Sequence, residues 1–134
     1  NKYLPFIPAS KLVTEFKGSF NKVTNSIRNL YVKFEVDNTF SKKNVFTTYN
    51  TETQTSGYTL LNAGLGADIV TKKNQTLFSL SFSALNIGDV AYQNHLSRLK
   101  YAAENVATGR SGVFNMGRNF SIKLNVPLNL NLGK

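Results

Sequence analysis

Hydrophobic and polar residues alternate with a period of two near the C-terminal end of the chain. From Phe120 to Leu132 every even-numbered position is apolar, whereas the odd-numbered positions carry serine, lysine, asparagine and proline. Successive side chains of a β-strand point to opposite faces, so the pattern predicts a strand over residues 120–132 with one apolar face. Pro127 weakens the last part of this prediction because proline has no N–H to donate to a neighbouring strand.

Four earlier segments show the same alternation, and the pattern indicates no helix anywhere in the chain. In the first of them Thr14 and Gly18 fall on the apolar side, which makes its alternation weaker than that of the others. The sequence therefore predicts an all-β chain of five antiparallel strands. The four earlier segments are residues 12–20, 29–37, 61–69 and 78–84.

The expected connections alternate between short and long. Residues 21–26 and 72–75 are short polar turns, whereas residues 40–56 and 88–112 are long loops. Bacterial outer-membrane barrels have short periplasmic turns, long outer loops and aromatic residues at the two membrane interfaces. Phe20, Phe40, Tyr58 and Phe78 lie near predicted strand ends, and Gly109 and Gly112 are expected to let the second long loop turn back toward the last strand.

Five strands are too few to close a membrane barrel. Single-chain bacterial barrels have an even number of strands, at least eight. An open five-stranded sheet leaves two edges with unpaired N–H and C=O groups. We therefore expect residues 1–134 to be a single segment of a larger transmembrane β-barrel, and we expect isolated copies to associate through their open edges.

Composition argues against an enzyme and against a metal site. The chain has no cysteine and one histidine, His95, which excludes thiolate chemistry and a multi-histidine metal site. Glu35 and Asp37 share a strand face, but any barrel with a polar interior can show such a pair. We expect no cofactor and no catalytic residues.

Four segments resemble parts of the TonB-dependent outer-membrane receptors, in particular their iron-complex receptor branch. They are spread over the chain from residue 4 to residue 127, in the order in which they occur in that family. They are LPFIPASKL at residues 4–12, TETQTSGYTLLNAGLG at 51–66, DVAYQNHLSRLKY at 89–101 and GVFNMGRNFSIKLNVP at 112–127.

The resemblance implies a barrel of about 22 strands, of which this chain is the C-terminal part, plugged by an N-terminal domain. Such receptors lie in the bacterial outer membrane, bind a nutrient such as a ferric siderophore or haem, and import it with energy from the TonB complex. The family's plug and TonB box have no counterpart in these residues. One departure is the tail, residues 128–134, which lacks the terminal aromatic residue that is usual in the family.

Five residues of the second long loop, or of the segment that leads from it to the last predicted strand, are candidate ligand contacts. Basic side chains there could attract an anionic chelate, because charge of one sign raises the local concentration of the opposite ion. The alternative is that the cations pair with Asp89 and Glu104 and that the histidine bonds locally, and we favour this structural alternative. The candidates are His95, Arg98, Lys100, Arg110 and Arg118.

Two soluble alternatives remain, both based on a five-stranded barrel. The net charge of +9 and the many aromatic residues suit an OB-like nucleic-acid binder, and the apolar alternation also suits a lipocalin-like pocket. Lys33 alternates with Glu35 and Asp37, however, so the strands carry no continuous basic face, and we expect no nucleic acid. The expected partners are outer-membrane lipid, lipopolysaccharide at the basic loops, a nutrient ligand, and the TonB complex through the plug.

Overall fold

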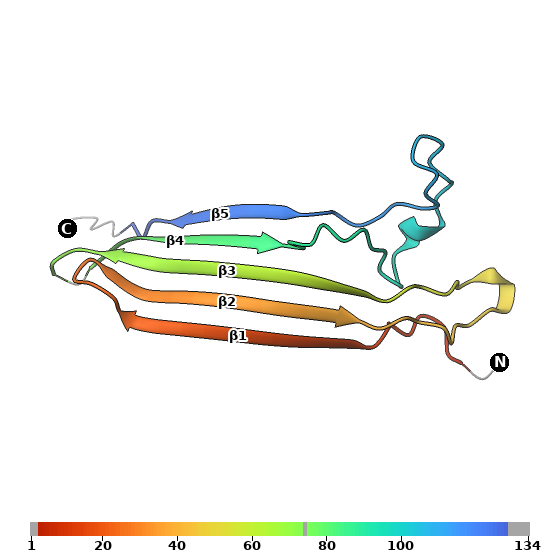
Figure 1. Cartoon of the computed structure of the whole chain (residues 1–134), viewed down its shortest axis with the longest axis horizontal. Helices are drawn as coiled ribbons and strands as arrows, with labels where there is room; N and C mark the ends of the chain where they lie inside the picture. The colour runs from red at the N-terminus through yellow and green to blue at the C-terminus, as the bar shows by residue number, and fades with distance from the viewer. Residues whose placement is uncertain (1–2, 74, 129–134) are drawn as a thin grey trace, which may run out of the picture.

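The chain forms one antiparallel sheet of five strands in the order β1-β2-β3-β4-β5, as a computed structural model of residues 3–73 and 75–128 shows (Figure 1). Two short 3-10 helices, η1 and η2, lie in the long loops. The prediction of five antiparallel strands is confirmed. The elements are β1 (Lys11–Lys22), β2 (Ile27–Thr39), η1 (Thr48–Asn50), β3 (Tyr58–Val70), β4 (Thr76–Leu85), η2 (Arg98–Tyr101) and β5 (Asn119–Asn125).

The register of the strands brings the apolar positions of all five together on one face. In one row across the sheet, Val32 lies opposite Leu65, Leu65 opposite Phe82, and Phe82 opposite Ile122. Directly opposed residues point to the same side of an antiparallel sheet. The alternation seen in five separate segments therefore becomes one continuous apolar surface, with the polar positions on the other side.

The apolar face is the more exposed of the two, which is the reverse of a water-soluble sheet. Leu65 and Ile122 are 49% and 73% exposed, whereas Asn62 on the polar face is 9% exposed. Among the described residues, the buried hydrophobic side chains are only Leu60, Val70 and Ala84. The accessible surface is 10215 Å², against about 7,000 Å² for a compact protein of this mass. The sheet therefore lacks a second layer to cover it.

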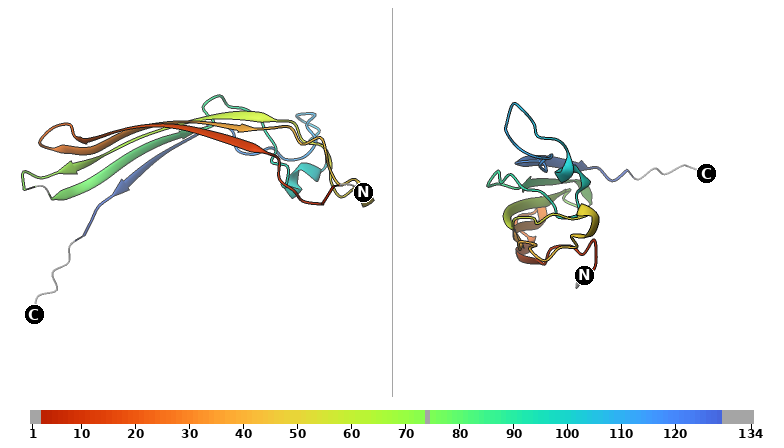
Figure 2. Two further views of the ribbon diagram at one scale, coloured as in Figure 1. Left: turned by 90° about the horizontal axis from the view of Figure 1, so that it is seen from below. Right: turned by 90° about the vertical axis from the view of Figure 1, so that its right-hand side faces the viewer.

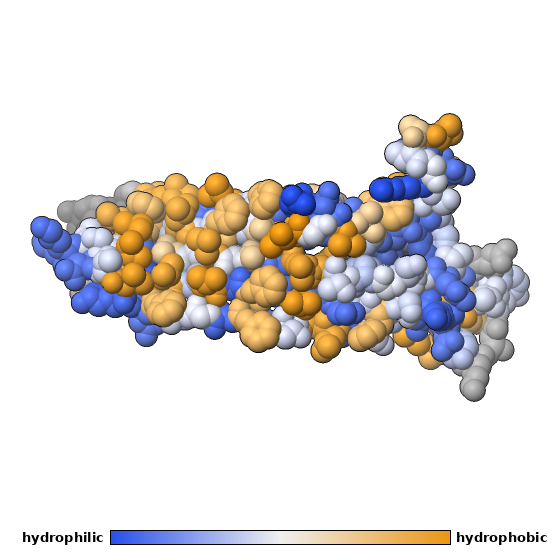
Figure 3. All heavy atoms as spheres, in the orientation of Figure 1, coloured by the Kyte–Doolittle hydropathy of each residue, from blue (hydrophilic) through white to orange (hydrophobic). Residues whose placement is uncertain are grey.

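The sheet is curved, and its apolar side is convex. Figure 2 shows the strands arching toward the side that faces the viewer in Figure 1. On that same side, hydrophobic side chains cover most of the strand region, whereas the loop end is largely polar (Figure 3). The polar positions consequently line the concave side.

The two edges of the sheet are open. β1 pairs with β2 alone, and β5 pairs with β4 alone. No contact joins β1 to β5 within the described residues, so the sheet does not close on itself. The described residues therefore form an open sheet and not a closed barrel.

Several boundaries differ from the sequence-based expectation. The strand predicted over residues 120–132 ends at Asn125, ahead of Pro127, whose ring nitrogen carries no hydrogen for a ladder bond; its last positions, 129–132, lie outside the described residues. The pattern also missed η1 and η2, which are too short to show helical periodicity. In residues 3–73 and 75–128 no helix is long and apolar enough to cross a membrane.

Candidate functional site

The two long loops meet at one end of the sheet, beyond the C-terminal end of β2 (Figure 1). The first loop, residues 40–57, is closed by paired backbone hydrogen bonds between Lys42 and Thr55, of 2.9 and 3.1 Å. The second loop, residues 86–118, contains η2 and a hairpin closed by Asn105 and Arg110. Both long loops are thus ordered by their own hydrogen bonds.

Thr55 connects the first loop to the second. Its Oγ1 lies 2.8 Å from Nδ1 of His95 and accepts a hydrogen bond of 2.9 Å from Nζ of Lys100. The same Nζ also donates to the carbonyl of Thr53 at 3.0 Å. His95 and Lys100 are both buried, at 5% and 9% exposure. The two side chains therefore hold the loops together.

The contacts of Thr55 fit either neutral tautomer of His95. An ammonium group can only donate, so the hydroxyl oxygen of Thr55 accepts from Lys100 and keeps one lone pair and one hydrogen for the ring. Nδ1 of His95 can therefore accept from this hydroxyl or donate to it. Nε2 of His95 is buried and has no hydrogen-bond partner within the described residues.

Burial keeps His95 neutral. Desolvation lowers the pKa of His95 below its ordinary value, and the positive charges of Lys100 and Lys42 lower it further. The carboxylate of Glu52 opposes this shift but does not reverse it. The histidine thus acts here as a neutral hydrogen-bonding group.

Glu52 anchors the N-terminal segment to the first loop, and the sequence analysis missed it. Its carboxylate accepts the backbone N–H of Phe46 at 3.0 Å and that of Phe6. These bonds, first of all the one from Phe46, lower the pKa of the Glu52 carboxyl, so the buried group stays ionised. The signal was available, because Glu52 is the one acidic residue of residues 40–57.

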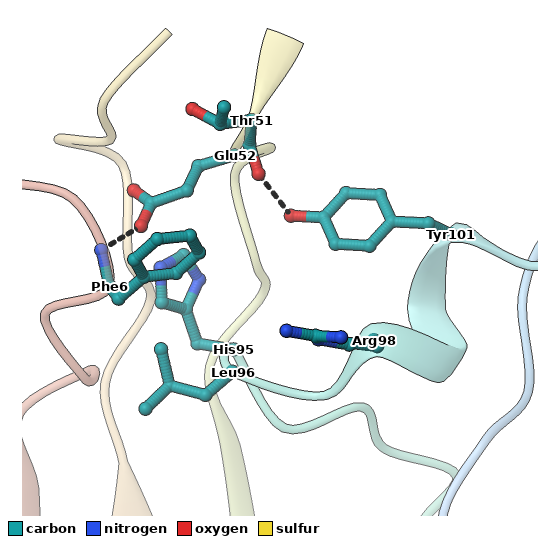
Figure 4. Close-up of a pocket in the computed structure, with 7 residues that line it drawn as sticks. All are labelled: Phe6, Thr51, Glu52, His95, Leu96, Arg98 and Tyr101. Atoms are coloured by element: carbon teal, nitrogen blue, oxygen red, sulfur yellow. Dashed lines mark hydrogen bonds between the residues drawn. The ribbon is translucent and has the colours of Figure 1, made fainter.

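A small pocket of about 280 Å³ opens beside this cluster (Figure 4). The ring of Phe6 lies in front of the His95 imidazole in this view, and the side chain of Arg98 extends from η2 toward His95. The hydroxyl of Tyr101 bonds weakly to the carbonyl of Thr51, at 3.4 Å. The lining residues are Phe6, Thr51, Glu52, His95, Leu96, Arg98 and Tyr101.

The five predicted site residues do not form one cluster. His95 and Lys100 meet at Thr55, and Arg98 lies beside them in the pocket. The guanidinium of Arg110 lies 5.2 Å from the ring centre of Phe114. Arg118 is exposed and directly precedes β5. Contact of any of the five with a ligand stays a prediction.

The acidic residues of the second loop do not form the ion pairs that were expected of them. Within the described residues, neither Asp89 nor Glu104 forms an ion pair with the predicted cations. Asp89 instead accepts the backbone N–H of Arg118 at 2.8 Å.

Gly112 lets the chain return toward β5, as predicted. Its φ is 74°, and a side chain at this position would collide with the carbonyl of Lys100.

A polar network crosses the concave face of the sheet. Nζ of Lys33 lies 3.1 Å from Glu15 and 3.2 Å from Glu35, on neighbouring strands. Glu35 accepts from the amide of Asn62 at 2.9 Å, and Asn62 in turn accepts the backbone N–H of Asn86 at 2.9 Å. The network links β1, β2, β3 and the start of the second loop.

The two carboxylates on β2 have different partners. Glu35 belongs to the network on the concave face, whereas Asp37 forms an ion pair of 2.6 Å with Lys11. Each acid is therefore engaged by its own neighbours.

Comparisons of the chain with protein-family models, with curated proteins and with solved structures give no match. Its function must therefore be inferred from the pattern of the strands and the geometry of the loops.

Proposed function

We propose that this chain is part of the wall of an outer-membrane receptor that imports a nutrient in a TonB-dependent manner. The carrying observation is the inverted sheet: its apolar side chains are exposed on the convex face, and its polar side chains are joined in a network on the concave face. Outer-membrane barrels present an apolar band to lipid and a polar surface to the lumen. The bacterial outer membrane is thus the proposed location.

The length of the apolar face fits a lipid-facing wall. On β3 the apolar positions run from Leu61 to Ile69, which at about 3.3 Å per residue is roughly 26 Å along the strand. At the tilt of about 40° that membrane strands have, this is about 20 Å along the membrane normal, against an outward apolar band of about 25 Å. β1 to β4 have 12, 13, 13 and 10 residues, and a tilted membrane strand needs about 9–11.

Aromatic residues lie toward both ends of the strand region, as at the two interfaces of a membrane barrel. Phe20 and Phe78 are near the short turns, and Phe40 begins the first long loop. Tyr58, which is on the concave face with Asn62, instead contacts Tyr92 of the second loop, with ring centres 4.5 Å apart. Aromatic girdles at both interfaces are typical of outer-membrane barrels.

In the proposed receptor, the long loops lie on the outer surface and help to select the ligand. The concave network lines the lumen, and a plug domain outside this chain gates passage and contacts the TonB complex. An iron chelate, such as a ferric siderophore or haem, is the proposed cargo on the basis of the family resemblance. The basic loop residues are proposed to contact anionic lipopolysaccharide.

The soluble alternatives fit this geometry less well. A lipocalin-like barrel turns its apolar side chains inward, whereas here they occupy the convex side. An OB-like barrel is a partly open Greek key, whereas here consecutive strands pair in a simple meander.

The test is to express the chain and refold it with and without detergent, following solubility, molecular mass and far-UV circular dichroism. We expect β-structure only in detergent or in an oligomer, because the apolar face needs a cover. A water-soluble, monodisperse, β-rich monomer would contradict the proposal and favour a soluble binding module. Ligands and single-stranded nucleic acid would then be tested next.

A further inference from the structure

We propose that the pocket between the two long loops binds a small organic anion, a carboxylate attached to an aromatic or apolar body. The clearest sign is Arg98, an exposed residue that lines the pocket and whose guanidinium has no hydrogen bond or ion pair to any other described residue. Arginine presents a planar set of donors that matches a carboxylate in a two-bond geometry. The inference that this pocket binds a nutrient rests on the proposed receptor function. The inference that it binds an anion rests only on the chemistry of its lining.

The charge balance around the pocket favours an anion. Glu52 is the one acid in the lining, and both of its oxygens already accept backbone N–H groups. Lys100 and Lys42 act on His95 from the same neighbourhood, and Arg98 adds a third positive charge. The three cations exceed the single carboxylate, so an incoming anion meets a net positive site.

The walls set the character of the rest of the ligand. Phe6, Leu96 and Tyr101 supply mainly ring and aliphatic surface. The volume of about 280 Å³ is just below the usual range of ligand pockets, about 300 to 1,000 Å³. A single ring with one carboxylate is therefore a better match than a large chelate.

His95 provides a second donor for the same anion. Its Nε2 is buried and lacks a partner within the described residues; in the tautomer that carries its hydrogen there, Nε2 is a buried donor without an acceptor, which is unfavourable. The Phe6 ring lies in front of the imidazole in Figure 4. Phe6 has a left-handed backbone, with φ of 59°, which a bulky residue rarely adopts. Movement of this ring would open Nε2–H to a ligand oxygen.

Lys100, by contrast, is excluded from ligand binding. Its ammonium group is buried and donates to Thr53 and Thr55. The proposal thus separates two neighbouring cations of η2, Arg98 as a ligand contact and Lys100 as a structural contact.

The test is a titration of the refolded chain with benzoate, with the neutral benzamide and inorganic phosphate as comparison probes. We expect saturable binding of benzoate, weaker binding of phosphate, and binding of benzamide weaker by about tenfold or more because it lacks the charge. In Arg98→Gln, benzoate affinity should fall about tenfold, and in Arg98→Lys it should fall less. Arg110→Gln removes the same charge from the hairpin outside the pocket and should leave the affinity within about twofold.

Equal loss in Arg98→Gln and Arg110→Gln would show binding by general positive charge and overturn the proposal, as would equal affinity for benzamide. Absence of saturable benzoate binding by a chain with native circular dichroism would also overturn it. The titration is carried out in detergent. It is repeated in water if the chain folds in water. Benzoate binding by a water-soluble monomer would uphold the pocket and reject the receptor wall, so the two proposals fail separately.

Discussion

Thr55 is the residue on which the contact between the long loops depends. Its hydroxyl is shared by His95 and Lys100, at 2.8 and 2.9 Å. We expect Thr55→Val to destabilise this contact by about 1–3 kcal/mol, because Nδ1 of His95 and one hydrogen of Lys100 lose their partner in a buried place. Hydrogen exchange of the loop amides in the refolded chain measures this loss.

The matched control is Thr55→Ser, which keeps the hydroxyl and removes only a methyl group. Its loop amides should exchange nearly as slowly as those of the parent chain. Equal exchange rates in the valine and serine variants would mean that the hydroxyl contributes nothing to the contact.

His95 also predicts how the loops respond to acid. Its pKa is lowered by burial and by the charge of Lys100, so between its folded pKa and the ordinary value near 6.5 the unfolded loop binds more protons than the folded one. Stability therefore rises with pH in this window and falls on acidification. The contribution of neutral His95 to the stability of the loops is present in full above about pH 6.5. It is lost as the pH falls through the lowered pKa of His95. Glu52, whose pKa is also lowered, adds a further loss below about pH 4.5.

Limited proteolysis of the loops from about pH 7.5 to 5.5 tests this prediction. The protease must have its activity calibrated at each pH on an unfolded substrate. Cleavage should increase toward the acidic end in the parent chain and stay constant in His95→Gln, which cannot titrate. The same increase in both chains would assign the pH dependence to another group.

At the scale of the strand, neighbouring residues on opposite faces of β5 should lose different amounts of stability on the same substitution. Ile122 is 73% exposed on the convex face, and Ser121 lies next to it on the concave face, 2.7 Å from Ser83. In water an exposed isoleucine can be replaced by lysine with little loss of stability. In lipid or detergent, Ile122→Lys should cost about 2–4 kcal/mol, the value for a lysine at the centre of the lipid face.

Ser121→Lys is the matched control, since it places the same charge on the polar face and gives up one hydrogen bond, at about 1 kcal/mol. Unfolding of both variants by denaturant in detergent micelles gives the two free energies. A cost for Ser121→Lys as large as that for Ile122→Lys would contradict the assignment of the convex face to lipid.

The strands could be predicted from the sequence because their chemistry repeats. Ile122 and Phe82 belong to alternating runs in which each residue supports the same period, and the structure pairs them as neighbours. The ends of the strands were less certain, because pairing extends into positions such as Lys22 and Thr39 that carry no apolar signal.

The loops could not be predicted in the same way. Thr55 and His95 are 40 residues apart in the chain, and no local pattern indicates that they meet. The charge pattern suggested that Lys100 pairs with an acid of its own loop, whereas the fold gives it the carbonyl of Thr53 instead. Such contacts depend on how two loops are placed by the sheet, which is information that no single segment holds.

For the whole molecule, the decisive feature is the pair of open edges. β1 and β5 offer 12 and 7 residues that pair on one side only. In an apolar medium each unpaired backbone group costs several kcal/mol, because no water is present to bond it. The chain in detergent is therefore expected to associate with copies of itself, edge to edge, at high concentration.

Sedimentation in detergent, with the mass of bound detergent subtracted, measures this association. The pairing of β1 with β5 of another copy is tested by a disulfide between Ser19→Cys and Ser121→Cys chains, mixed before refolding. Ser19 is on an edge strand, and so is Ser121, so a cross-link between two chains is expected only when edges meet. A chain that stays strictly monomeric as its concentration rises would contradict open-edge pairing. It would mean that this sheet covers its edges by itself, and a wall segment of a larger barrel could not do so.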